Sequence, residues 1–316
     1  MKDTHVEAGK AIQQQTGKTF HLATRLLPER VRHPTYVLYG FFRICDEVVD
    51  DAADVPPEEQ AKRLESLRNQ ALGSKPPDDP VLEAFNDLRE SHGIADEEVA
   101  VFIDAMAADI EKSRYENYEE LEEYMRGSAA AVGQMMTSVM NPANPDRARP
   151  HATALGEAFQ LTNFLRDVRE DVEDRNRIYL PRTTRERHGV TDEQIGRLEF
   201  TDGFAAVMHD ELRRAEALYR EGVAGIQYLP EDCQFAVLLA AVLYAEYHRV
   251  IRAQGYDVLS REPSFGTTRK LVLLAKTRWH WRKTGDPETV FRAVSPVGTP
   301  EHRGSDVERR DTLPTR

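Results

Sequence analysis

The sequence predicts an all-α protein that folds as one helical bundle around a central cavity. In nearly every segment between prolines and glycines, apolar residues recur at three- and four-residue spacing, which is the period of an amphipathic helix. Alternating strand-like runs are almost absent. Two segments also carry rows of carboxylates among apolar residues. Because buried charges are costly unless they are compensated, these rows indicate a polar cavity inside the bundle.

The expected helices follow one another between breaks made by proline, glycine and polar loop residues. In chain order they cover residues 5–15, 19–26, 34–53, 57–72, 80–91, 96–114, 118–139, 151–173, 192–198, 202–226, 230–255 and 267–283. The breaks fall at Pro28, at Pro56 and Pro57, at 73–80, at 141–150 and at Pro181. None has the character of an interdomain linker, so residues 1–284 are predicted to form one domain. Few large apolar residues follow, and residues 285–316 are predicted to be a disordered tail.

Composition and charge exclude several classes of protein. The net charge of -12 disfavours binding to nucleic acid, whose phosphates attract basic surfaces, and it is compatible with a salty cytoplasm. The longest apolar stretch, 235–245, is too short to cross a bilayer, which takes about 20 residues. The first ten residues lack the apolar core of a secretory signal, so we expect a cytoplasmic protein. Cys45 and Cys233 form no CxxC pair and are expected to be buried packing residues.

The first acidic row lies in a strongly helical segment. Asp46 and Asp50 are four residues apart, so they project from the same face of the helix. Arg43 precedes Asp46 by three residues and occupies the same side. Taken alone, such a pair is most often a solvated acidic surface.

A second row changes that interpretation. Asn163, Asp167 and Asp171 recur every four positions and share one helix face, with Gln160 just before them and Arg166 on the flank. Apolar residues surround this row, which favours carboxylates that face a cavity rather than solvent.

Several carboxylates in an apolar cavity call for cations. Hard oxygen ligands on two helices suit Mg²⁺, which keeps water ligands and binds substrate phosphates. A diphosphate is the expected third component. Basic and hydroxyl residues could bind its remaining oxygens, and the candidates are Lys18, Thr19, Arg43, Arg166 and Arg177.

At these residues the chain resembles the squalene and phytoene synthase family. One signature is Arg43-Ile-Cys-Asp46-Glu-Val-Val-Asp50, and the other runs from Gln160-Leu-Thr-Asn163 through Asp167 and Asp171 to Asn176-Arg177-Ile-Tyr179-Leu-Pro181. Gly17-Lys18-Thr19-Phe20 and the segment around Tyr124 are similar to further family segments. The resemblance covers about residues 10–283 and is strongest to prokaryotic, including haloarchaeal, members. Glu47 and Gly17 depart from the pattern, since Asp and Ser are common there.

The resemblance implies a helical bundle of the class I isoprenoid synthase type that uses Mg²⁺, with Mn²⁺ as a substitute. Asp46, Asp50, Asn163, Asp167 and Asp171 would hold the metal, and the four aspartates, with Tyr124 near the departing diphosphate, would be catalytic. The residues expected to contact substrate are Lys18, Thr19, Tyr39, Arg43, Gln160, Arg166, Arg177 and Tyr247.

The implied reaction is head-to-head condensation of two geranylgeranyl diphosphates to phytoene, through a cyclopropyl diphosphate, in carotenoid biosynthesis. This branch needs no NADPH. The alternative within the family is a squalene or dehydrosqualene synthase acting on farnesyl diphosphate. The sequence does not identify the desaturase that would act next.

Two alternatives of other classes stay open. The first is a non-catalytic scaffold with this fold that binds a lipid or a protein, although both acidic rows are intact. The second is a chain-elongating prenyltransferase or cyclase, whose DDxxD spacing is absent from residues 46–51.

Contact with a membrane surface is a separate expectation. Residues 269–283 combine basic, apolar and aromatic side chains, as a helix lying on a membrane does. The alternative is a terminal helix packed on the bundle.

Overall fold

The structure, a computed structural model, describes residues 18–50 and 55–297 and confirms the all-α prediction. This part of the chain contains no strand, only an isolated bridge between Arg114 and Ile178. The elements in chain order are α2 (Lys18–Thr24), α3 (Glu29–Asp50), α4 (Pro57–Ala71), α5 (Pro80–His92), α6 (Asp96–Ala108), α7 (Tyr118–Met125), the π-helix η1 (Arg126–Ala130), α8 (Ala131–Met140), α9 (Pro145–Arg166), α10 (Val168–Arg175), α11 (Arg182–Arg187), α12 (Asp192–Gly196), α13 (Asp202–Ala224), the 3₁₀ helix η2 (Ile226–Tyr228), α14 (Glu231–Ala253), α15 (Thr267–Thr284) and α16 (Pro287–Val294). The predicted helix at 5–15 lies outside the described residues.

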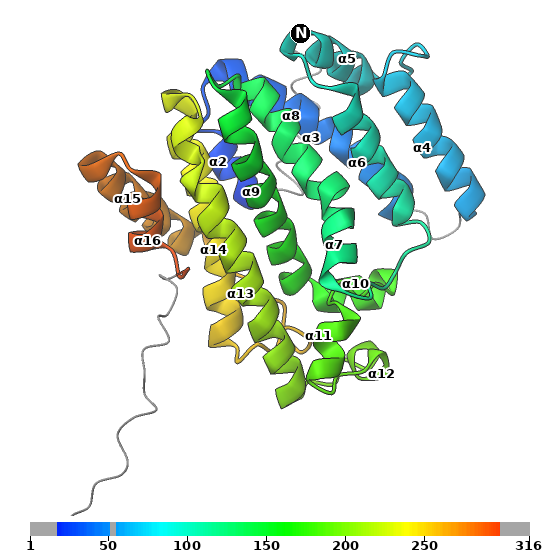
Figure 1. Ribbon diagram of the computed structural model, residues 1–316, viewed down its shortest axis with the longest axis vertical. Coiled ribbons are helices and arrows are strands. Elements are labelled where there is room, and N and C mark those ends of the chain that lie inside the picture. Colours follow the sequence, from blue (N-terminus) through cyan, green and yellow to red (C-terminus); the bar gives the residue numbers. More distant parts are fainter. Residues whose placement is uncertain (1–17, 51–54, 298–316) are drawn as a thin grey trace, which may run out of the picture.

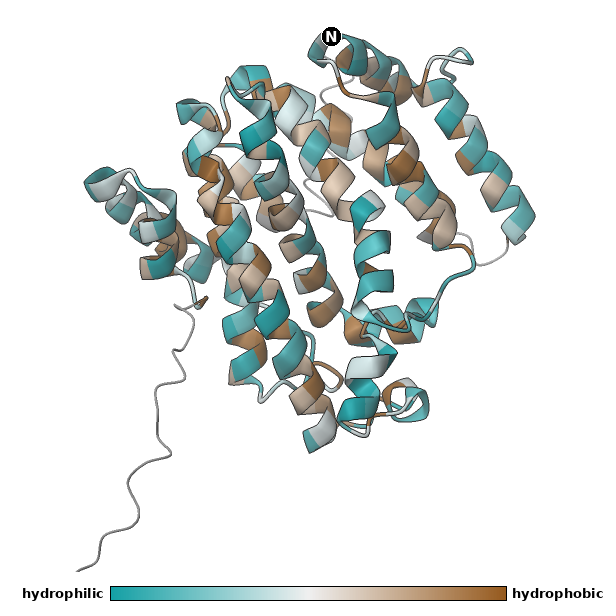
Figure 2. Cartoon of the chain, viewed as in Figure 1, coloured by the Kyte–Doolittle hydropathy of each residue, from teal (hydrophilic) through white to brown (hydrophobic). Residues whose placement is uncertain are grey.

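The helices stand side by side, with α9 near the middle of the bundle (Figure 1). Helix α9 packs on α13 and on α8, and α14 packs on α2 and α9. Helices α4 and α5 lie at one edge, and α15 and α16 at the other. Hydrophobic and hydrophilic residues alternate along most helices (Figure 2), as expected when one face of each helix turns to the core.

Local signals explain where several helices begin and end. Helix α5 starts after Asp79, whose side chain accepts a hydrogen bond of 2.6 Å from the Val81 N–H, and Pro80 occupies the first helical position. It ends at Gly93, which has a left-handed φ of 61°. Asn117 caps α7 in the same way by accepting from Glu120 N–H.

Helix α9 approaches its neighbours closely because glycines stand at the contact points. A Cβ on Gly133 of α8 would lie 2.5 Å from the Ala152 carbonyl oxygen, and one on Gly222 of α13 would lie 2.6 Å from the Leu155 Cβ. The small side chains in this part of the sequence therefore serve close packing. Gly133 and Gly222 also line the cavity described below.

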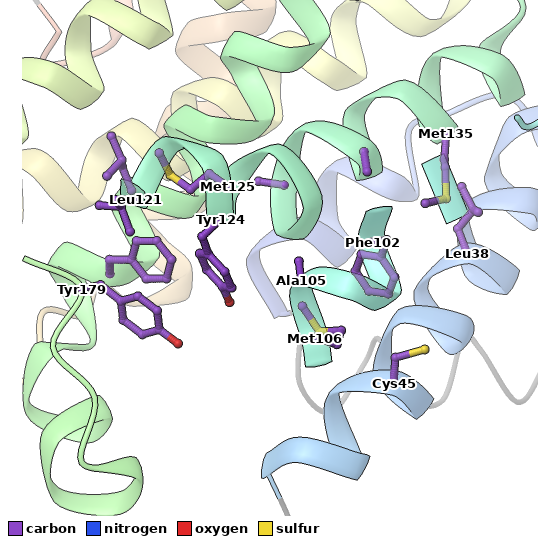
Figure 3. Close-up of a cluster of buried hydrophobic side chains, with 14 of the residues drawn as sticks. Leu38, Cys45, Phe102, Ala105, Met106, Leu121, Tyr124, Met125, Met135 and Tyr179 are labelled. Atoms are coloured by element: carbon purple, nitrogen blue, oxygen red, sulfur yellow. The ribbon is translucent and has the colours of Figure 1, made fainter. Parts of the chain in front are cut away.

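Two hydrophobic clusters hold the bundle together. The larger joins α3, α5, α6 and α8, and includes the stacked rings of Phe41 and Phe85 with centroids 3.9 Å apart. Figure 3 shows part of it, with Phe102 and Met106 of α6 near Leu38 and Cys45 of α3. The smaller cluster joins α13, α14, α15 and α16. Both cysteines are buried and free, as predicted.

The prediction of disorder from residue 285 is wrong for its first part. Residues 287–294 form α16, and Val290 and Phe291 are buried in the smaller cluster. The helix starts at Pro287 behind Asp286, whose carboxylate accepts from Thr289 N–H. A short helix with one apolar face gains its stability from packing, which overall composition does not reveal. Residues 298–316 lie outside the described part.

Other predictions also differ from the structure, since the helix predicted at 96–114 ends at Ala108 and α11 was not predicted. The segment predicted as one helix at 151–173 is split at Asp167 into α9 and α10. The proline-rich 141–150 stretch is not wholly a loop, since α9 starts at Pro145 and contains Pro150. Proline costs about 3 kcal/mol inside a helix, so packing of α9 on both neighbours outweighs that cost.

Candidate active site

A cavity of about 610 Å³ runs through the bundle between α3, α8, α9 and α14. On α9 its wall extends from Ala148 to Arg166, or roughly 27 Å at about 1.5 Å per residue. One end is polar, and the remainder is lined mainly by apolar side chains. The predicted site residues in the wall are Tyr39, Arg43, Asp46, Tyr124, Gln160, Asn163, Arg166, Asp167, Asp171 and Arg177.

Helix α3 brings Tyr39, Arg43 and Asp46 to the cavity from one face, as their spacing predicted. The Arg43 Nε lies 3.1 Å from Glu47 Oε1, one turn further on. Glu47 is one of the two residues that depart from the family pattern. In this chain it therefore holds the guanidinium of a predicted substrate ligand. The side chain of Asp50 lies outside the described residues.

The second acidic row survives the break at Asp167. The Asp167 N–H donates to the Asn163 carbonyl at 2.9 Å, and the Asp171 N–H donates to the Asp167 carbonyl at 2.8 Å. Because these helical bonds continue across the break, the three side chains stay on the cavity side. Arg166 donates from Nε to Oδ1 of the next residue, Asp167, at 2.6 Å. This predicted substrate ligand is therefore already paired with an acidic neighbour.

The oxygen donors on α9 and α10 fit a hard divalent cation. The Asn163 Oδ1 is buried and accepts no hydrogen bond. Burial, together with the Asp167 carboxylate, raises the pKa of Asp171 to about 8, although Arg175 lies 3.4 Å away. A cation would favour the charged carboxylate and occupy the free amide oxygen.

Within the described residues, no three His, Cys, Asp or Glu side chains are close enough to enclose a metal ion. A cation held here would take its remaining ligands from water and substrate phosphate. Mg²⁺ prefers that arrangement.

Tyr124 lies on α7 beside the π-helix η1, where it reaches the cavity wall. Its hydroxyl donates to Asp109 Oδ2 at 2.6 Å. Arg177, another predicted ligand, donates from Nη2 to the Asp109 backbone carbonyl at 2.7 Å. In Figure 3 the Tyr124 ring lies between Tyr179 and the α6 residues Ala105 and Met106.

Among the predicted site residues whose side chains the structure describes, Tyr247 is the one that does not line the cavity. Its ring lies 4.9 Å from the Arg166 guanidinium. It follows Ala240, which does line the cavity, by seven residues on the same face of α14. A direct contact between Tyr247 and substrate stays a prediction. The side chains of Lys18 and Thr19 lie outside the described residues.

Sequence reasoning missed Asp109 and Tyr179 as wall residues. Asp109 directly follows α6, in a segment predicted only as helix, and no second acidic residue repeats at helical spacing to mark it as part of a site. Its contact with Arg177 spans 68 residues. A signal was available only for Tyr179, which stands inside the second family signature.

A helical bundle that surrounds an apolar cavity with paired acidic helices at one end defines a class of fold and site, and comparison with known proteins identifies the family. The squalene/phytoene synthase family model matches residues 13–270. The chain belongs to this family.

Relatives and solved structures agree with that assignment. A phytoene synthase from Cereibacter sphaeroides is 36% identical over 81% of this chain and 74% of the relative. A 15-cis-phytoene synthase from Synechocystis sp. is 33% identical over 85% of this chain and 82% of the relative. The crystal structure of a dehydrosqualene synthase in complex with ligand is 27% identical, covers 89% of this chain and 98% of that chain, and superposes with a TM-score of 0.80. Membership of the family makes the chain a prenyltransferase.

Proposed function

We propose that this protein condenses two geranylgeranyl diphosphates head to head into phytoene, through a cyclopropyl diphosphate, in carotenoid biosynthesis. The observation that carries the proposal is the identity of 36% and 33% to two phytoene synthases over more than four fifths of the chain. The long apolar cavity with acidic helices at one end suits a prenyl chain attached to a diphosphate. We also propose that the family domain comprises residues 1–284, with α16 packed against it.

The acidic end of the cavity is where the negative charge of the departing diphosphate would be stabilised. Asp46, Asp50, Asn163, Asp167 and Asp171 would hold Mg²⁺, or Mn²⁺ in its place. When bound, the cation neutralises charge that builds on the departing diphosphate. Arg43 and Arg166 would contact the phosphate oxygens, and their pairing with Glu47 and Asp167 keeps both guanidinium groups at the cavity end before substrate arrives. Such preorganised groups lower the barrier without reorganising during the reaction.

The apolar part of the cavity protects the cations that form after the diphosphate leaves. Phe102, Met106 and Met136 line it, and their side chains bring no hydroxyl group, amine or water ligand to the cation. Excluding water there prevents early capture of the cation as an alcohol. Gln160 and Tyr39 would orient the diphosphate ends at the boundary between the two regions.

A dehydrosqualene or squalene synthase acting on farnesyl diphosphate is the second candidate, and the fold similarity to a dehydrosqualene synthase favours it. Purified protein is expected to convert geranylgeranyl diphosphate and Mg²⁺, without NADPH, into a C40 hydrocarbon detected by mass analysis. Chelation of the metal is expected to stop the reaction. A C30 product from farnesyl diphosphate alone would replace the first candidate by the second, and no product from either would favour the scaffold alternative.

We further propose that α15 contacts an anionic membrane surface. Its exposed apolar residues are Leu271 (55% exposed), Val272 (40%) and Trp279 (55%). Lys276, Arg278, Arg282 and Lys283 are also exposed, and α15 contains no acidic residue although the whole chain has a net charge of -12. Leu273 and Thr277 face the bundle, so the helix is packed on one side only. Among the described helices, none is long and apolar enough to cross a bilayer, so the proposed contact is peripheral.

Vesicle binding tests this contact. The wild type is expected to float with vesicles that contain anionic lipid and to stay unbound with purely zwitterionic ones, because cations and interfacial apolar groups act together. The double variant Leu271→Ser, Trp279→Ser is expected to lose binding and keep its activity on detergent-dispersed substrate. Phe200→Ser, which changes an exposed ring elsewhere (37% exposed), serves as the control. Wild-type protein that stays unbound with both vesicle types would contradict the proposal.

A further inference from the structure

Asp109 is a carboxylate in the cavity wall that belongs to neither acidic row. It directly follows α6, at the carboxyl end of that helix, where the helix dipole disfavours negative charge. Its side chain is 8% exposed. A buried carboxylate in this position needs specific partners, and the structure provides two.

The first partner is Tyr124, whose hydroxyl donates to Asp109 Oδ2 at 2.6 Å. The second is Arg177, which follows the acidic helix α10 in the sequence. The Arg177 Nη1 is 3.9 Å from Asp109 Oδ2, and its Nη2 donates to the Asp109 carbonyl at 2.7 Å. Arg177 therefore places a positive charge beside the carboxylate, and the Tyr124 hydroxyl is hydrogen-bonded to that carboxylate at the cavity wall.

Aromatic rings lie around the hydrogen bond between Tyr124 and Asp109. The Tyr124 ring centroid lies 5.8 Å from that of Tyr179, which in turn stacks on Phe164 at 3.9 Å. Tyr124, Tyr179 and Phe164 all line the cavity, and Figure 3 shows the hydroxyl groups of the two tyrosines on the same side of the cluster. Aromatic faces attract cations, so a substrate cation is expected to rest against this wall, within reach of the Tyr124 oxygen.

Tyr124 cannot release its proton in advance. Burial raises the pKa of Tyr124 well above its ordinary value, and the neighbouring Tyr179 and the Asp109 charge raise it further. The phenol is therefore neutral in the resting site. It can pass its proton to Asp109 only while its oxygen accepts a second proton from a group in the cavity.

Head-to-head condensation without a reductant requires such an acceptor, because the hydrocarbon cation becomes neutral by losing a proton. The carboxylates of the two acidic rows are poorly suited to accept this proton, since they would be bound to Mg²⁺ that holds the diphosphate. We propose that Asp109 is the positioning residue that makes the Tyr124 hydroxyl oxygen the acceptor of this proton. The inference rests on the proposed function.

The step balances without an added oxidant or reductant. A C–H bond on the carbon next to the cationic carbon breaks, and its electron pair forms the second bond of a carbon–carbon double bond between these two atoms. The proton moves to the Tyr124 oxygen as the phenol proton moves to Asp109 Oδ2. Tyr124 ends unchanged, and Asp109 ends as a carboxylic acid that returns its proton to solvent between turnovers.

Asp109→Asn tests the inference, because asparagine keeps the shape and can still accept the Tyr124 hydrogen bond but takes no proton. The variant is expected to lower kcat about 100-fold, the lower range for loss of general base catalysis, with little change in KM. Its cation would persist and react with water, so allylic alcohols should increase relative to hydrocarbon. Tyr124→Phe leaves the Asp109–Arg177 pair intact and should give the same shift in products. The double variant should be no worse than either single one, since the two residues act as a unit.

Asp104→Asn is the matched control. Asp104 stands on the same helix, is exposed and pairs with Arg68 at 2.6 Å, and its replacement should leave both rate and products unchanged. A folded Asp109→Asn enzyme with normal kcat, or one that is slower with the wild-type ratio of hydrocarbon to alcohol, would overturn the inference. If the wild type itself formed no hydrocarbon from either diphosphate, the proposed function would fail instead.

Discussion

Replacing Asp46 by asparagine is expected to lower kcat/KM about 1,000-fold while the fold stays intact. The substitution removes one negative charge from the acidic end of the cavity and changes little in volume. A thousandfold loss corresponds to about 4 kcal/mol of transition-state stabilisation. This is the scale expected when the metal ion that stabilises the departing diphosphate loses one of its protein ligands. Steady-state kinetics with geranylgeranyl diphosphate at saturating Mg²⁺ measures the loss, and thermal unfolding measures the fold.

The comparison variant is Asp87→Asn, which makes the same chemical change at an exposed position on α5 and should retain full activity. Asp167→Asn should also abolish turnover. It is a less selective change, because it also removes the ion pair between Asp167 and the Arg166 guanidinium. Near-normal turnover by a folded Asp46→Asn protein would refute the assignment of the acidic rows to metal binding.

Helical spacing predicted the polar end of the cavity well. The four-residue interval from Asn163 to Asp171 indicated a shared face, and that face is preserved although the helix breaks at Asp167. The reason is local, because the backbone bonds at 163–167 and 167–171 keep helical connectivity. The same spacing placed Arg43 and Asp46 on one side of α3. The roles of these residues in binding metal and substrate stay predictions.

Contacts between distant segments could not be predicted in this way. Nothing near Asp109 in the sequence indicates that Tyr124 and Arg177 converge on it, since that depends on how α6, α7 and the segment after α10 pack. Helix α16 was missed for a related reason. Its apolar residues Val290 and Phe291 are few, and they become informative only when α13 and α14 provide a surface that covers them. Periodicity reports which residues share a face, whereas the partner of that face is a property of the whole fold.

The close contact between α9 and α13 leads to the largest expected effect on stability. In Gly222→Ala the new Cβ would lie 2.6 Å from the Leu155 Cβ and 2.7 Å from its Cα and backbone N. These atoms belong to a packed helix and cannot turn aside as a flexible side chain would, so the two helices must separate. Overpacking of this kind costs about 1–3 kcal/mol. The midpoint of urea unfolding is expected to fall accordingly.

Gly196→Ala is the control for the added methyl group itself. A Cβ at this helical position, in α12, would meet nothing within 4 Å, so the change should be neutral or stabilise the protein by up to about 1 kcal/mol through helix propensity. Gly222 also lines the cavity, and separation of α9 from α13 should therefore weaken binding of the long prenyl chain and raise KM. Equal unfolding midpoints for Gly222→Ala and wild type would show that the two helices are not packed as closely as the structure indicates.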